Sequence, residues 1–579
     1  MNVFSYLALL VGAWLVLAVI YMGIGLWFRR AMGLRDLAPC DLLLLPVLGW
    51  CLTIPFLMIW HFFRPIDVWP LLAIAACGLA GVARHGASLA ALVAHAVRRR
   101  LGFVAVLIIA GFVLANHTAV QHTMYDSGFY HLSAINWVQS YSIVPGLGNL
   151  SKMLGFNDSY FLYVAMLDRG PFAFRVHHVA GSFLIYMLLC RSLAGFWRVL
   201  FGSGKIRRHQ LLDSLILIYI FVLTMGPNGA SHSPDLAVYI LGFVLGSEVL
   251  RLLESAADAP SVAGGAAATR NPELLMQFYG IVLIAAVGVT VKLNVLVFAV
   301  VSCILGLSAV SQAIGLNRAI RGRFPVMALG CVGFVVVPWC LRGVLLTGSI
   351  GYPSSLLTFP VEWRVPVEAA QAYVHEIRAW ARQPYEDPDV VMAGWAWIRP
   401  WANEMMRGPY HVVTPLALGL VGAPLIAWAT RIRISALGFP VSFLMLPVAA
   451  LLFWFLAAPD PRFAGASFWL LGAGALSLVL AELDRKTVSI VLISFAMVSM
   501  TMNFNPIAFV LRWQRDMGPE RTGPLATMTT ASGLQVHVPV EGYQVWRAPL
   551  PSTPYFNPDL RLRVPGDLSA GFTVLPPAR

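Results

Sequence analysis

Long apolar segments separated by short polar links restrict what this chain can fold into. Fourteen segments come close to the roughly 20 residues that a helix needs to cross a bilayer. They are residues 3–28, 41–62, 66–83, 101–116, 174–190, 211–226, 235–253, 275–291, 293–315, 324–346, 412–429, 435–458, 465–481 and 487–503. Of the 579 residues, 59% are hydrophobic and only 12% are charged. The pattern predicts an all-α polytopic membrane protein with about 14 transmembrane helices.

Basic residues are concentrated in every second link. These links hold 21 of the 40 lysines and arginines, and the short links between them hold only Arg64, Lys292 and Arg462. Because cytoplasmic links carry the excess of Lys and Arg, the basic links are expected inside and both termini outside. The net charge of +13 is therefore a topology signal, and we expect no nucleic-acid partner. We expect a multi-pass protein of a bacterial inner (plasma) membrane.

Three long regions fall on the predicted outer side and divide the chain. The N-terminal transmembrane helices (1–116) are followed by a first large outer loop (117–173) and a transmembrane core (174–346). A second outer loop (347–411), the C-terminal transmembrane helices (412–503) and an extracytoplasmic tail (504–579) complete the chain. In the tail, short runs at 535–538 and 543–546 predict a small β-containing appendage. The small-residue stretch 254–273 reads as a cytoplasmic linker.

Polar residues gather on the predicted outer side, whereas the helix interiors look nearly devoid of Asp, Glu, Lys and Arg. A transporter needs ionisable groups at mid-membrane depth, where its substrate site alternates. The pattern therefore disfavours a channel or transporter and indicates chemistry at the outer face.

Asp126 is the leading candidate for that chemistry. It lies in Tyr125-Asp126-Ser-Gly-Phe-Tyr-His131, about ten residues beyond the end of a predicted helix and among aromatic residues. A carboxylate at a membrane surface is costly unless it is used or satisfied. The alternative is an ordinary acid that caps a helix predicted over 128–140.

Asp235 and Lys292 are two further outer candidates, each with a plain alternative. Asp235 follows Ser233-Pro234 where a helix begins, so it can be a site residue or part of an N-terminal cap. Lys292 is a single cation between two apolar runs. It can bind phosphate, or its ammonium can simply reach the membrane surface.

Two arginines complete the outer set. Arg342 lies near the outer end of its helix in Pro338-Trp-Cys-Leu-Arg342, and Arg462 lies in the short link Pro459-Asp-Pro-Arg462. Together with Lys292 they run against the expected charge bias, which suggests an anionic ligand. Pairing of Arg462 with Asp460 is the structural alternative.

These motifs resemble the C-type (GT-C) glycosyltransferase superfamily of multi-helix membrane enzymes. Tyr125-Asp126-Ser-Gly-Phe-Tyr resembles the acid motif of its first outer loop, and Ser233-Pro-Asp235 resembles its second outer acid. Pro338-Trp-Cys-Leu-Arg342 with Thr347-Gly348 is similar to a Pro-Trp-x-x-Arg-Asn…Gly pattern, with Gly343 in place of Asn. Here the acid loop follows the fourth predicted helix, so three N-terminal helices are extra. The acid loop with Pro145-Gly-Leu-Gly-Asn149, and the run 549–557, also resemble poorly characterised bacterial multi-pass membrane proteins.

The resemblance implies a GT-C-like fold and an inverting hexosyl- or pentosyltransferase in cell-envelope polysaccharide biosynthesis. Such an enzyme takes a sugar from a polyprenyl-phosphate carrier and gives it to a glycan, lipid or protein acceptor. Asp126 would be the catalytic base, while Lys292, Arg342 and Arg462 would bind the donor phosphate. Asp235 and His131 would position the acceptor or a metal, with a divalent cation (Mg²⁺ or Mn²⁺) left open.

The residue inventory suits that reaction. Glycoside hydrolysis generally uses two carboxyl groups because a poor leaving group must be protonated. A phosphate leaving group is already a stable anion that cations can stabilise, so one carboxylate can act as base on the acceptor hydroxyl. The alternative is a polysaccharide or O-antigen polymerase or ligase, for which the arginines and tryptophans of 347–411, including Arg364 and Arg399, would form the active region. A lipid or glycan transporter is a third alternative.

Overall fold

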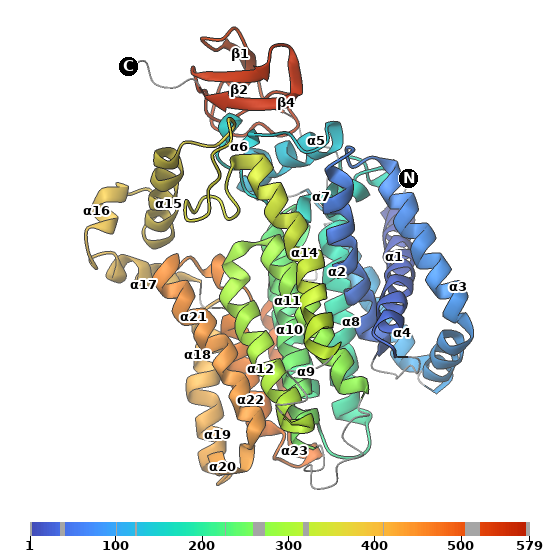
Figure 1. Ribbon diagram of the computed structural model, residues 1–579. Helices are drawn as coiled ribbons and strands as arrows, with labels where there is room; N and C mark the ends of the chain where they lie inside the picture. The colour runs from blue at the N-terminus through green and yellow to red at the C-terminus, as the bar shows by residue number, and fades with distance from the viewer. Residues whose placement is uncertain are drawn as a thin grey trace.

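The computed structural model describes residues 3–34, 41–99, 101–121, 124–225, 227–258, 272–315, 323–408, 410–503 and 522–574. Most of the linker predicted at 254–273, and His122 in the acid loop, lie outside these residues. The molecule is a bundle of long helices with a small β appendage at one end (Figure 1).

Each of the fourteen predicted segments coincides with helical structure. The bundle helices are α1 (Val3–Ala31), α2 (Asp41–His61), α3 (Val68–Arg99), α4 (Leu101–Thr118), α8 (Ala180–Phe201), α9 (Arg208–Met225), α10 (Pro234–Ala257), α11 (Pro272–Val291), α12 (Leu296–Ile314), α14 (Arg323–Thr347), α18 (Val413–Ala417), α19 (Ala423–Ala429), α21 (Met445–Ala457), α22 (Ser467–Leu480) and α23 (Arg485–Asn503). A π-helical turn, η7 (Leu418–Gly422), joins α18 to α19.

Ten helices within the described ranges are long and apolar enough to cross a membrane. They are Val3–Ala31, Leu42–His61, Val68–Gly86, Leu101–Thr118, Val176–Phe201, Pro234–Ala257, Glu273–Val291, Leu293–Ile314, Phe324–Thr347 and Phe439–Ala457. Two shorter apolar helices, Val413–Ala429 and Ser467–Leu480, accompany them. The protein is therefore mostly helical, with ten helices in the described chain that could span a membrane. The count of fourteen spans and the GT-C-like fold remain predictions.

The described parts of the three long regions predicted to share one side do lie at one end of the bundle, which we call the appendage end (Figure 1). The first contributes α5 (Leu132–Ser140), α6 (Leu147–Leu150) and α7 (Tyr160–Leu167). The second contributes α15 (Val367–Arg382), α16 (Pro388–Met392) and α17 (Ile398–Arg407). The described residues of the links that are rich in Lys and Arg lie at the opposite end (Figure 1).

The N-terminal helices pack by close backbone contact. A Cβ atom added to Gly23 in α1 would lie 1.8 Å from the carbonyl oxygen of Gly78 in α3, and one added to Gly49 in α2 would lie 1.8 Å from that of Tyr21. Small residues permit such an approach in membranes, where van der Waals packing drives helix association. These helices therefore form a tightly joined unit.

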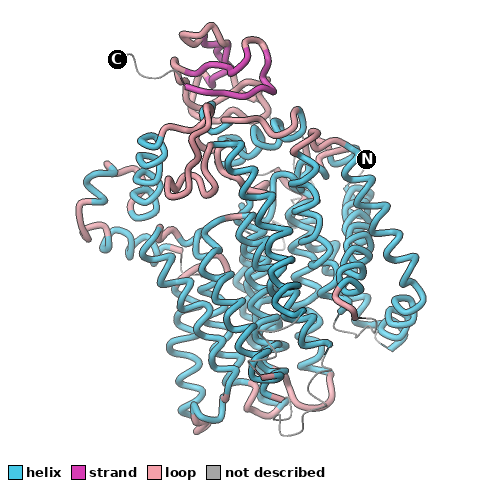
Figure 2. The backbone as a smooth tube through the Cα atoms, viewed as in Figure 1, coloured by secondary structure: helices cyan, strands magenta, loops and turns pink. Residues whose placement is uncertain are grey.

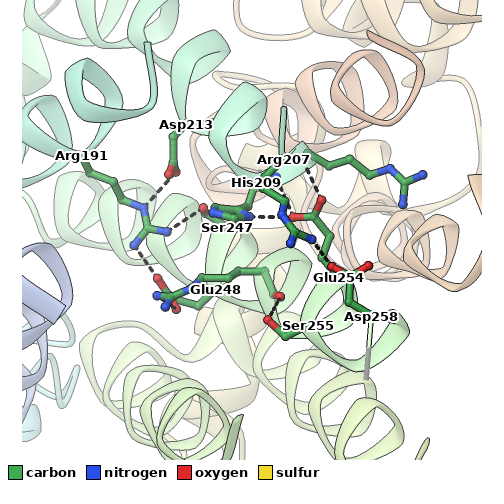
Figure 3. Close-up of polar contacts among 11 residues, drawn as sticks. Arg191, Arg207, His209, Asp213, Ser247, Glu248, Glu254, Ser255 and Asp258 are labelled. Atoms are coloured by element: carbon green, nitrogen blue, oxygen red, sulfur yellow. Dashed lines mark hydrogen bonds and ion pairs between the residues drawn. The ribbon is translucent and has the colours of Figure 1, made fainter. Parts of the chain in front are cut away.

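Charged residues are buried among three of the helices, so the prediction of helix interiors nearly devoid of charge is wrong there. Arg191 of α8 donates from Nε to Asp213 of α9 (2.9 Å), from Nη1 to Glu248 of α10 (2.6 Å) and from Nη2 to Ser247 (2.7 Å) (Figure 3). We call these four residues the buried ion cluster. The predicted segment 174–190 ends just before Arg191, whereas α8 continues to Phe201.

A second set of polar contacts extends from this cluster along the same helices. The Glu254 carboxylate accepts from His209 Nδ1 at 2.6 Å, and Arg207 pairs with Asp258 (Figure 3). The Arg207 and Asp258 side chains are 43% and 57% exposed. Burial therefore decreases from the ion cluster toward the end of α10.

The appendage contains two antiparallel two-stranded sheets, and strands occur only there in the described chain (Figure 2). β1 (Leu525–Thr529) pairs with β2 (Gln535–Pro539), and β3 (Leu560–Val564) pairs with β4 (Asp567–Val574). The strand expected at 535–538 is confirmed as part of β2. The one expected at 543–546 is wrong, because that segment packs as an irregular turn against the first large loop.

Candidate functional site

Asp126 immediately precedes η1 (Ser127–His131), a single π-helical turn that leads into α5. The helix predicted over 128–140 is therefore present, but the Asp126 side chain makes no capping hydrogen bond. Its Oδ2 atom instead accepts from Arg462 Nη1 at 3.0 Å. The capping alternative for Asp126 is wrong. Isolated π-helical turns occur frequently at functional sites.

Arg462 lies between two carboxylates in the link from α21 to α22. Asp460 accepts the backbone N–H of Arg462 at 3.0 Å and lies 3.2 Å from its Nε atom. Burial would lower the pKa of Arg462, but the surrounding carboxylates, Asp460 first, raise it above its usual value. The predicted alternative, pairing with Asp460, is present together with the contact to Asp126.

Asp235 and Lys292 form a second ion pair. Ser233 caps α10 by accepting the backbone N–H of Asp235, so capping belongs to the serine. The Asp235 carboxylate, with a side chain 4% exposed, pairs with the Lys292 ammonium at the end of α11. Lys292 is itself only 20% exposed, so its side chain does not simply extend into solvent.

Phe463 connects the two ion pairs. Its ring centre lies 4.9 Å from Lys292 Nζ and 4.9 Å from Arg462 Cζ, within the range of cation–π attraction. The backbone of this link is held by Asn294, which donates to the Phe463 carbonyl at 2.8 Å, and by Tyr239, which donates to the Pro461 carbonyl at 3.3 Å. Two cations and their carboxylates are therefore gathered around one rigid link.

His131 lies at the end of η1, within the electric field of both ion pairs. Burial lowers the pKa of this histidine to about 4, against the opposing effect of the Asp126 and Asp235 carboxylates. The ring is therefore neutral near pH 7 and exchanges hydrogen bonds without adding a charge. Its buried Nδ1 atom has no hydrogen-bond partner among the residues that the structure describes.

Asp158, just before α7, interacts electrostatically with Lys292 and Asp235 and is not among the residues predicted from the sequence. Burial raises the pKa of its carboxyl to about 7; Asp235 adds to the effect and Lys292 opposes it. No ion pair or side-chain hydrogen bond of Asp158 is found in the described part of the chain. An acid inside a long outer loop gives no pattern in the sequence, so only the tertiary arrangement identifies it.

Arg342 lies next to this group without direct contact to it. Its Nε atom donates to Asn157 Oδ1 at 3.2 Å, and its Nη1 atom lies 2.6 Å from His61 Nδ1. It is 4% exposed and lines a small cavity together with Asp158 and His61. The structure thus brings together Asp126, His131, Asp235, Lys292 and Arg462, which we call the acid–cation group. The predicted phosphate contact of Arg342 stays a prediction.

The described residues offer few ways to hold a metal ion. Among them, no group of three or more His, Cys, Asp or Glu side chains is arranged to hold a metal ion. The carboxylates of the acid–cation group instead contact arginine and lysine. The role of a divalent cation therefore stays open.

These observations define a mostly helical protein with ten candidate membrane spans in its described residues and a compact charged group at one end of its bundle. The chain belongs to the family described as "Domain of unknown function (DUF8201)", which matches residues 7–469. That range contains all the predicted site residues and ends before the β appendage. No curated protein and no solved structure matches the chain.

Proposed function

We propose that this protein is an integral membrane glycosyltransferase that moves a sugar from a polyprenyl-phosphate carrier to an acceptor at the appendage end of the bundle. The observation that carries the proposal is the Asp126–Arg462 contact beside the Asp235–Lys292 pair. A base and two cations, held within one partly exposed group, are the functional groups that transfer from a phosphate carrier requires.

The reaction follows from that arrangement. Asp126 takes the proton of an acceptor hydroxyl while the hydroxyl oxygen attacks the anomeric carbon with inversion. The bond from that carbon to the phosphate oxygen breaks, and the phosphate leaves as an anion. Lys292 and Arg462 stabilise the charge that develops on it. Because donor phosphate competes with Asp126 for Arg462, donor binding would release the carboxylate to act as base.

The other residues take supporting roles in this proposal. Asp235 holds Lys292 and, with His131, orients the acceptor. Arg342 would reach the phosphate only through the cavity that it shares with Asp158. A neutral His131 fits an orienting role because it binds hydroxyl groups without competing for the anion.

An apolar cleft beside the cations supports a lipid-linked donor. Val238, Phe298 and Trp454 line it, and it reaches Phe463, whose ring contacts both cations. A lipid-linked donor could place its phosphate against Lys292 and Arg462 and its hydrocarbon chain in this apolar cleft. By the distribution of Lys and Arg, we place the appendage end outside a bacterial inner membrane, at the periplasm or cell exterior.

Sugar transfer in membranes tests the proposal. Membranes that contain the full chain would be supplied with radiolabelled hexoses and pentoses on polyprenyl monophosphate and diphosphate. We expect label to move to an acceptor fraction, and Asp126→Asn to lower the rate at least 100-fold. Asp559→Asn, an exposed acid in the appendage, is the matched control and should keep full activity. Full activity of Asp126→Asn would exclude the proposed base.

The polymerase or ligase alternative predicts a different set of sensitive residues. Arg364 and Arg399 are both exposed at the appendage end. Loss of glycan polymerisation or ligation in Arg364→Ala or Arg399→Ala, with full activity in Asp126→Asn, would favour that alternative.

A further inference from the structure

The segment Gln544–Ala548 of the appendage, which we call the strap, lies directly against the loop that carries Asp126. It is part of the connection between β2 and β3 and forms neither strand nor helix. The family match ends at residue 469, so the strap lies outside it. The strap and this loop are far apart in sequence: Gln544 lies 419 positions after Tyr125.

Two strap residues hold the backbone on either side of Asp126. Gln544 Nε2 donates to the carbonyl of Tyr125, the preceding residue, at 3.2 Å. The backbone N–H of Trp546 donates to the carbonyl of Gly128, inside η1, at 2.8 Å. The acid is therefore bracketed by hydrogen bonds from the appendage.

The Trp546 ring also packs closely against Gly128 in η1. A Cβ atom added to Gly128 would lie 2.6 Å from Trp546 Cε2, so the indole occupies the space that any larger residue would need. Trp546 itself has φ 48°, in the left-handed region that bulky residues avoid at a cost of roughly 1–2 kcal/mol. Such a conformation persists where surrounding contacts enforce it.

The rest of the strap is anchored to the same region. Arg547 Nη2 lies 2.5 Å from Asp168 Oδ2, and its guanidinium lies 5.0 Å from the Phe174 ring centre. Asn136 of α5 donates to the Ala548 carbonyl at 3.2 Å. The Arg547 and Asp168 side chains are 16% and 3% exposed, so this ion pair is largely shielded from water.

We propose that the strap is part of the functional site and that Trp546 is a positioning residue, which holds η1 so that Asp126 faces Arg462. The inference rests on the proposed function for the role of Asp126. Displacement of a catalytic group by about 1 Å can cost on the order of 100-fold in rate. The appendage thus completes the site from outside the family's shared region.

Hydrogen–deuterium exchange tests the positioning without any substrate. In the purified full chain, Trp546→Ala should speed amide exchange in the peptide covering 124–135, because η1 loses its outer contact. Val540→Ala, an exposed position in the same appendage, should leave that peptide unchanged. Unchanged exchange in Trp546→Ala overturns the inference, whatever the activity of the protein.

Gly128→Ala disturbs the same contact from the other side and does not depend on the folding of the appendage. It should speed exchange in the same peptide, and its effect should be strongly non-additive with that of Trp546→Ala, because both remove one contact. Additive effects would show that the two residues act separately and would overturn the inference.

Transfer kinetics then separate positioning from binding. With the donor that supports transfer, Trp546→Ala should lower kcat at least 10-fold with KM for the donor nearly unchanged, and Trp546→Phe should recover most of the rate. A rise in KM alone would overturn the positioning role. If the wild-type chain transfers no sugar at all, the proposed function fails, while the exchange result still decides whether the strap holds the loop.

Discussion

Two charged groups in this molecule use the same residue types in opposite ways. In the buried ion cluster, all three nitrogens of the Arg191 guanidinium donate hydrogen bonds, and the Arg191, Asp213 and Glu248 side chains are 7%, 8% and 1% exposed. In the acid–cation group, Asp126 and Arg462 are 25% and 35% exposed, and the buried Arg462 Nε atom has no well-formed hydrogen bond among the described residues.

The difference in exposure separates charged residues that hold helices together from charged residues that a ligand can reach. Every nitrogen of the buried Arg191 guanidinium already donates to a partner, so this cation has no unpaired nitrogen left for a ligand, and its removal would leave two buried acids without their cation. A partly exposed pair can exchange its partner for a substrate at small cost. By this criterion the Arg191 cluster joins three helices, and the partly exposed Asp126–Arg462 pair is the place where we propose that an anion binds.

The largest expected effect is on folding, from the loss of Arg191. Arg191→Leu leaves Asp213 and Glu248 buried without their common cation, which typically costs about 3–5 kcal/mol. We expect strongly reduced protein in the membrane and a lower unfolding temperature in detergent. Addition of Asp213→Asn and Glu248→Gln should recover part of the loss. If Arg191→Leu kept normal stability but lost transport of a lipid or glycan across the membrane, the transporter alternative would be favoured.

Arg462→Ala should show the reverse pattern. Its partners are partly hydrated, so the unfolding temperature should change little, whereas loss of a charge-stabilising group should lower sugar transfer on the order of 100- to 1,000-fold. Arg407→Ala, which removes an exposed arginine paired with Glu404, is the control. Equal losses of stability in Arg462→Ala and Arg191→Leu would remove the distinction between the two groups.

Asp158 gives a pH-dependent effect of intermediate size. Its pKa is about 7 in the folded chain and near 3.8 in an unfolded one, so its contribution to stability falls as pH rises from about 4 to 7. Asp158→Asn should therefore raise the unfolding temperature at pH 8 relative to the wild type and leave it unchanged near pH 4. His131, with a pKa of about 4, gives the opposite slope over this range, so only the difference between variant and wild type is informative. A difference that does not vary with pH would contradict the assignment.

The smallest effect is expected for Arg207, at the exposed edge of the contacts in Figure 3. Arg207→Ala removes an ion pair with Asp258 whose members are 43% and 57% exposed. Such pairs contribute about 0–1 kcal/mol, and salt screens them further. At low and at high salt, thermal unfolding should show a small decrease in unfolding temperature relative to the wild type for Arg207→Ala and a large decrease for Arg191→Leu.

The helices were predictable because length and composition are enough to identify them. The grouping of Asp126 with Arg462 was not, because 336 residues separate the two and only folding brings them together. The apolar run ends at residue 190, so hydropathy alone leaves Arg191 outside the predicted segment, although α8 continues to Phe201. Asp158 and Trp546 carry no local pattern, and the left-handed backbone of Trp546 is set by the loop beneath it.

The buried ion cluster also bears on how the chain enters the membrane during synthesis. A single charge at the centre of an inserting helix costs about 2.5–3.5 kcal/mol. Arg191 meets Glu248 only after a further 57 residues of chain have been made. Until then α8 carries its cation without that partner, so α8, α9 and α10 become stable in lipid only as a set. We expect a nascent chain that stops before residue 248 to hold α8 in contact with the insertion machinery, which site-specific cross-linking from α8 would detect.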